Sequence, residues 1–87
     1  MKQGPEFFGD EVELALVYIA RRLNEALKVE EVLNAAEFDY LVEPDSYSGG
    51  LIFRTERIGA FFYVVPAKED QARAVLNGQG FKPYSTA

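Results

Sequence analysis

The sequence centres on Ile58-Gly59-Ala60-Phe61-Phe62-Tyr63-Val64-Val65-Pro66, an uncharged run with three consecutive aromatics, two adjacent valines and a closing proline. Its length and its β-branched and aromatic content favour a strand over a helix, and a strand that is apolar on both sides belongs inside a sheet or against a partner. We therefore expect it to be the central strand. Because side chains alternate along a strand, Phe61 and Tyr63 share one face and Phe62 takes the other, so the face without helices must be covered by something.

Working outward from this run, hydrophobic periodicity and turn residues divide the rest of the chain into elements. They predict strands at 12–20, 38–43, 51–56 and 60–65, a turn or bulge at 57–59, helices at 24–37 and 66–78, and a short last strand at 80–84. A helix is the alternative for 12–20. Asn24 is the expected N-cap of the first helix, and Pro44 is expected to end the second strand.

This order is β-α-β-β-α-β with one extra strand segment. Two helices on one face of an antiparallel sheet give the α+β, ferredoxin-like arrangement. At 87 residues the chain makes one domain, which we place at residues 12–84. Residues 1–11, with the isolated pair Phe7-Phe8, are expected to form an irregular arm, and residues 85–87 to fray.

Composition narrows the class of function. The formal net charge of −5 and the scattered basic residues argue against nucleic acid and anionic membranes as partners. No run resembles a signal peptide or a membrane span, so we expect a cytoplasmic protein. The absence of Cys and His excludes disulfides, thiolate nucleophiles, His-assisted triads and typical zinc sites, and we expect no metal or cofactor.

Several short motifs lie in or beside the two predicted helices: Glu25-Ala26, Val65-Pro66, Glu69-Asp70, Ala72, Ala74 and Leu76. These residues resemble the outline of a known family of small bacterial signal-transducing domains, and the likeness covers roughly residues 12–84. The resemblance implies a regulatory fold of the PII-like or ACT-like kind, without a known ligand. One departure is Glu37-Phe38, where the family outline has Gly-Ile, so we expect the turn after the first helix to be built differently.

A glycine-bearing segment is the candidate ligand site. Ser46, Tyr47, Ser48, Gly49 and Gly50 offer backbone N–H groups, two hydroxyls and a phenol that could wrap a small polar or anionic ligand. The simpler interpretation is a flexible connection between strands, because no P-loop lysine or G-x-G-x-x-G accompanies the pair of glycines.

Two arginines follow that segment and extend the same candidate site. Arg54 and Arg57 could present guanidinium groups to a carboxylate or phosphate, but a solvated cross-strand ion pair is the simpler expectation. Glu43 and Asp45, either side of Pro44, fall far short of a calcium loop.

The aromatic run suggests an interface. We expect one side of Phe61, Phe62 and Tyr63 to pack under the helices and the other to close a homodimer. An RNA-binding strand is a weaker alternative, because Ile58 and Gly59 stand where a Gly and an aromatic should follow the basic residue.

An enzyme is the other alternative to an interaction module. A small dimeric enzyme with an apolar cavity would use Tyr40, Tyr63 or Glu43 as acid–base groups. The sequence thus favours a non-catalytic regulatory or interaction module that self-associates through its sheet and senses a small ligand or protein partner.

Overall fold

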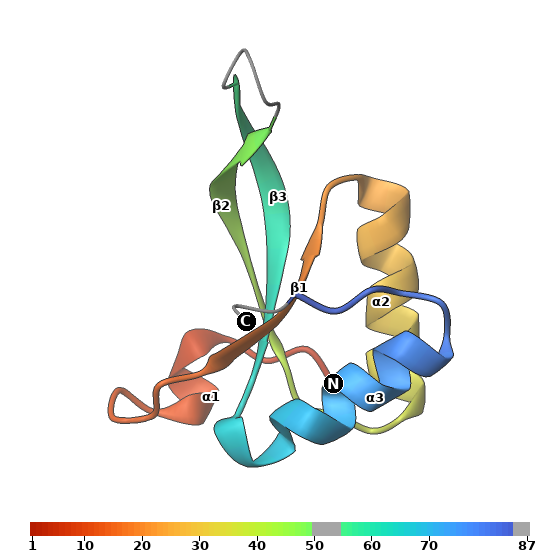
Figure 1. The fold of residues 1–87 in the computed structure, drawn as a ribbon. Helices are drawn as coiled ribbons and strands as arrows, with labels where there is room; N and C mark the ends of the chain where they lie inside the picture. The colour runs from red at the N-terminus through yellow and green to blue at the C-terminus, as the bar shows by residue number, and fades with distance from the viewer. Residues whose placement is uncertain (50–54, 85–87) are drawn as a thin grey trace.

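The computed structural model describes residues 1–49 and 55–84. The elements, in chain order, are α1 (Pro5–Phe8), β1 (Ala15–Ala20), α2 (Leu23–Ala35), β2 (Leu41–Gly49), β3 (Thr55–Val64), the single 3-10 turn η1 (Pro66–Lys68) and α3 (Glu69–Gly78) (Figure 1). The three strands form one antiparallel sheet in the order β1-β3-β2. The protein is therefore α+β, and the run expected to supply the central strand does so as the second half of β3.

The helices differ slightly from those the sequence predicted. The arm contains the one-turn helix α1, and α2 begins after the N-cap Arg22 rather than after Asn24. Residues 15–20 are a strand, so the helical alternative for that segment is wrong. With 13 residues, α2 is the longest helix of the described chain, and it is too short and too polar to cross a bilayer.

Strands β2 and β3 are longer than predicted. Their pairing is uninterrupted from Leu41 opposite Tyr63 to Gly49 opposite Thr55, so the turn or bulge expected at 57–59 is not formed. The first five residues of β3, before Ala60, have no partner in β1. There β2 and β3 continue past the helices as a two-stranded ribbon (Figure 1).

Strand β2 continues through Pro44 because the backbone nitrogen of Pro44 faces the outer edge of the sheet, away from β3. The backbone of Tyr40 faces away from β3: its carbonyl accepts a bond of 2.8 Å from the Gln3 N–H, and its N–H donates over 3.3 Å to the Met1 carbonyl. Strand alternation gives Pro44 the same outward orientation, so β3 needs no N–H from it. The outward N–H of Ser46 donates to the Asp45 carboxylate over 2.8 Å.

The main core lies between the sheet and the two long helices, which cover the same face (Figure 1). Phe62 and Val64 of β3 are fully buried there, on the face opposite Phe61 and Tyr63. The helices contribute one apolar stripe each: Ala26, Val29 and Leu33 from α2, and Ala72 and Leu76 from α3. Burial of these side chains is the main stabilising contribution, at roughly 1.5–3 kcal/mol for each large one.

A β-bulge interrupts β1. Leu16 pairs with Tyr63 and Tyr18 pairs with Phe62, so Val17 is an extra residue on the β1 side. Val17 and Tyr18, at 0% and 6% exposed, both belong to the main core cluster, whereas strict alternation would place them on opposite faces. The bulge turns Tyr18 toward the helices while Leu16 remains on the opposite face.

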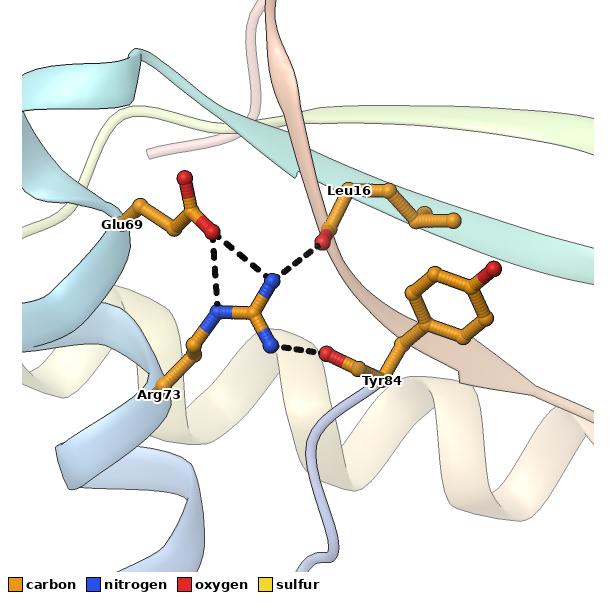
Figure 2. A network of polar contacts seen from close by, with 4 residues as sticks. All are labelled: Leu16, Glu69, Arg73 and Tyr84. Atoms are coloured by element: carbon orange, nitrogen blue, oxygen red, sulfur yellow. Dashed lines mark hydrogen bonds and ion pairs between the residues drawn. The ribbon is translucent and has the colours of Figure 1, made fainter. Parts of the chain in front are cut away.

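The expected last strand is absent from the described residues. Arg73 of α3 instead supplies hydrogen bonds to the outer edge of β1 and to the segment after α3. Figure 2 shows the Arg73 guanidinium between two chain segments, with Nη2 donating to the Leu16 carbonyl at 3.2 Å and Nη1 to the Tyr84 carbonyl. Residues 81–84 lie along the outer edge of β1, where the Tyr84 N–H donates to the Val17 carbonyl at 2.8 Å.

Helix α2 ends in a Schellman motif, with Glu37 in the left-handed region at φ 63°. The Phe38 N–H donates to the Leu33 carbonyl and the Glu37 N–H to the Asn34 carbonyl, each at 3.0 Å. Glycine normally takes this position, so the turn is built here with a residue that the left-handed conformation strains.

Replacing Arg73 by Ala should lower the free energy of unfolding by about 1–3 kcal/mol, because the Leu16 and Tyr84 carbonyls lose their donor. Glu69→Gln is the matched control: it removes the i,i+4 ion pair, whose Nη2–Oε2 distance is 2.8 Å, and should cost at most about 0.5 kcal/mol. Urea unfolding checks both. Equal losses in the two variants would show that the ion pair, not the carbonyl contacts, matters.

Replacing Glu37 by Gly should stabilise the protein by roughly 1 kcal/mol, since a non-glycine residue at φ 63° carries backbone strain. Glu37→Ala keeps the Cβ and should bring no comparable gain. The thermal midpoints of the two variants measure the difference. A Gly variant less stable than the Ala variant would contradict the strain argument.

Candidate functional site on the uncovered sheet face

The residues of the expected ligand loop do not form a loop in the described chain. Ser46, Tyr47, Ser48 and Gly49 belong to β2 and pair with β3. Gly50 and Arg54 lie outside the described residues. Arg57 is exposed on β3 opposite Tyr47, so what is described of this set runs along a ribbon rather than around a pocket.

The three consecutive aromatics divide between the two faces of the sheet. Phe62 is fully buried under the helices, where its ring lies 6.0 Å from that of Tyr40. Phe61 and Tyr63 are on the opposite face, with Phe61 8% exposed and Tyr63 half-buried. Of the three residues expected at an interface, only Phe61 and Tyr63 are therefore on a face that α2 and α3 leave open.

That open face is the candidate site, and we call it the uncovered face. Cross-strand partners share a face, so Phe61 and Tyr63 are joined there by the residues opposite them in β1 and β2. Its apolar members are Leu16, Ile19, Leu41, Phe61 and Tyr63. All three strands contribute, and the five side chains are buried or half-buried rather than fully exposed.

Charged groups extend the uncovered face along the ribbon. Glu43 is opposite Phe61, Asp45 opposite Gly59, and Arg57 follows on the same face of β3. Burial raises the pKa of Tyr63, and the nearby carboxylates of Asp45 and Glu43 raise it further. The face therefore has an apolar part, an acidic part and one arginine in sequence along the strands.

The acid–base groups of the enzyme alternative do not converge. Tyr63 and Glu43 are on the uncovered face, whereas Tyr40 is fully buried on the helix side of the sheet. Burial raises the pKa of Tyr40 to about 12, and the Glu30 carboxylate adds to the rise. The Tyr40 hydroxyl lies near Glu30 and Asn34, yet it has no well-formed hydrogen bond within the described chain.

A polar pair that the sequence did not reveal joins β1 to α2. The Tyr18 hydroxyl donates to Glu25 Oε2 at 2.6 Å, and the Arg21 N–H donates to Glu25 Oε1 at 2.7 Å. Burial raises the pKa of Glu25, but these hydrogen bonds and the Arg21 charge outweigh it and hold the pKa below its usual range. The only sequence signal was an acid in the first helical turn, because the bulge that aims Tyr18 at Glu25 has no signature.

The N-terminal aromatics line a pocket of about 220 Å³ at the end of the sheet where β3 leads into η1. Phe7 and Phe8 make an edge-to-face contact, with ring centroids 5.0 Å apart, and Phe38 lies on the other wall. Lys68 and Glu37 are among its polar lining residues. The arm is therefore packed against the domain, although Phe7 remains 54% exposed.

Comparison of the chain with protein-family models, with curated proteins and with solved structures gives no match in any of the three. Any function must therefore be argued from the geometry described above.

Two Tyr→Phe variants should differ in their effect on stability. Tyr18→Phe removes a hydrogen bond to a carboxylate and should cost about 1–2 kcal/mol at pH 7, whereas Tyr40→Phe removes a buried unpaired hydroxyl and should be neutral or stabilising. Urea unfolding of both variants at pH 7 makes the comparison. A larger loss for Tyr40→Phe would show that its hydroxyl has an effective partner.

Stability should also decline in alkali. An unfolded tyrosine ionises near pH 10, about two units below the pKa of buried Tyr40, so the unfolded state loses its proton first. The free energy of unfolding should therefore fall as the pH rises from about 10 toward 12, and Tyr40→Phe should reduce that fall. Urea unfolding at pH 8 and pH 11 tests it. Identical slopes for the two proteins would contradict this assignment.

Proposed function

We propose that the protein is a non-catalytic regulatory or interaction module, working in the cytoplasm, that self-associates through the uncovered face of its sheet. The observation that carries the proposal is the apolar cluster on that face, because α2 and α3 both pack on the other side. A sheet with apolar residues on both faces is typical of a layer between two partners. A second copy of this chain is the partner that we propose.

The charges of the uncovered face suit a twofold contact. Along β3, Arg57 lies two residues before Gly59 and Phe61 lies two residues after it. Glu43 of β2 is opposite Phe61. A twofold axis near Gly59, which is opposite Asp45, would bring Arg57 of each copy close to the acidic residues Glu43 and Asp45 of the other. Such a contact uses the same surface on both copies, as closed dimers do.

The edges of the sheet are poorly suited to association, which favours the face. At the β2 edge, Pro44 has no N–H and the Ser46 N–H is already bonded to Asp45. At the β1 edge, the Leu16 carbonyl is bonded to Arg73 and the Val17 carbonyl to the Tyr84 N–H. Edge-to-edge extension would have to displace these contacts.

We further propose that the fold is a ferredoxin-like arrangement with an incomplete outer strand. Its support is the strand order β1-β3-β2, the two helices on one face, and the course of residues 81–84 along the free edge of β1. The resemblance to signal-transducing domains agrees with this proposal, and so does a regulatory role.

The alternative functions have less support. An enzyme would need acid–base groups on one side of the sheet, and Tyr40 is separated from Tyr63 and Glu43. An RNA-binding sheet would need exposed aromatics, and Phe61 is only 8% exposed beside Glu43 and Asp45.

Size-exclusion chromatography with light scattering over a concentration series should show a monomer–dimer equilibrium. Glu43→Arg and Arg57→Glu should each weaken the dimer at least about tenfold, because each opposes like charges across the twofold contact. The double variant Glu43→Arg/Arg57→Glu should restore association. Both side chains are exposed, so circular dichroism should be unchanged in all three variants.

A protein that stays monomeric at millimolar concentration would overturn the proposal. Failure of the double variant to recover, with both single variants weakened, would place the contact elsewhere on the face.

A further inference from the structure

A surface hollow of about 510 Å³ lies where β1 leads into α2, remote from the aromatic pocket of the N-terminal arm. Its lining residues are Arg21, Arg22, Asn24, Glu25, Lys28 and Phe81. We call this site the basic hollow. Five of these residues come from one short stretch and Phe81 comes from the segment after α3, so the hollow exists only in the folded chain.

The charge of the basic hollow is opposite to that of the protein as a whole. Three of its six lining residues are cationic, whereas the chain has a formal net charge of −5. The single acid, Glu25, is already engaged: one oxygen accepts from the Tyr18 hydroxyl and the other from the Arg21 N–H. Glu25 is thus turned toward the protein, and the positive side chains dominate what a ligand would meet.

The aromatic wall is held in place. Phe81 packs edge-to-face on Tyr18, with ring centroids 5.9 Å apart, and its N–H donates to the Leu76 carbonyl at 2.9 Å. The ring is only partly buried, so part of it borders the hollow. A flat ring can stack on such a surface, as nucleobases do on aromatic side chains.

We propose that the basic hollow binds a small phosphorylated molecule that carries a flat aromatic ring, the chemistry of a nucleoside diphosphate. Arg22 and Lys28 would bind the phosphates, and Phe81 would stack on the ring. The volume lies within the roughly 300–1,000 Å³ of small-molecule sites. This site is separate from the uncovered face, so it stands whether or not the protein dimerises.

Titrations followed by ¹⁵N–¹H NMR and calorimetry test the proposal with ADP, adenosine and inorganic phosphate as probes. ADP should bind, with shifts concentrated in residues 21–28 and at Phe81. Adenosine and phosphate should each bind at least about tenfold more weakly, because each lacks one half of the recognition.

Matched variants assign the two halves of the site. Arg22→Glu and Lys28→Glu should each weaken ADP binding at least tenfold, whereas Lys68→Glu, an exposed lysine of η1 outside the hollow, should leave it nearly unchanged. Phe81→Leu should weaken ADP and adenosine but not phosphate. Circular dichroism and thermal melts confirm that each variant is folded.

Three results would overturn the proposal. The first is no ADP binding at millimolar concentration. The second is equal binding of ADP and phosphate with no effect of Phe81→Leu, which would indicate a plain anion site. The third is single-stranded RNA binding much more tightly than ADP through the same cations, which would replace the small ligand with a polymer.

Discussion

The central strand β3 has to be covered on both of its faces, and most of the structure follows from that requirement. Phe62 and Val64 on one face are buried by α2 and α3, which hold the main core. Phe61 and Tyr63 are on the other face, which α2 and α3 do not cover, beside their cross-strand neighbours in β1 and β2. The asymmetry between a helix-covered face and an uncovered face is what makes self-association the best-supported proposal.

The two edges of the sheet are closed in different ways. On the β2 side, proline and a side-chain bond to a backbone N–H remove donors from the edge. On the β1 side, the outward carbonyls of Leu16 and Val17 accept hydrogen bonds, from the Arg73 guanidinium and from the Tyr84 N–H respectively. Both devices leave the broad face as the surface through which a partner can bind with least rearrangement.

Hydrophobic pattern was sufficient to predict the fold class and the central strand. The pattern of Phe61, Phe62 and Tyr63 also predicted that Phe62 is on the opposite face from the other two, because strand periodicity depends only on the sequence, but it did not predict which face the helices cover. Pro44 and residues 57–59 were interpreted as strand ends because local propensity cannot show which side of a strand is an edge. That depends on tertiary pairing, and so does the use of Arg73 in place of a ladder.

Little of the basic hollow could be predicted from the sequence. Arg21, Arg22 and Lys28 read as scattered surface charges, and Phe81 is more than fifty residues away from them. They meet because α3 returns the chain to the β1–α2 junction. The bulge at Val17 directs Tyr18 toward Glu25 and Phe81. The sequence has no turn residue at this position that would predict the bulge.

The strand order also has a consequence for the folding pathway. β2 and β3 are close in sequence, so their ribbon can form early at a small cost in chain entropy. Ala20 pairs with Ala60, so β1 must close a loop of 40 residues before it adds to the ribbon. The pairing of β1 with β3 joins parts of the chain that are distant in sequence, and we expect this step to limit the rate of folding. Until β1 arrives, the apolar side of β3 that α2 will cover stays open to solvent, and this is the stage at which the chain is most exposed to aggregation.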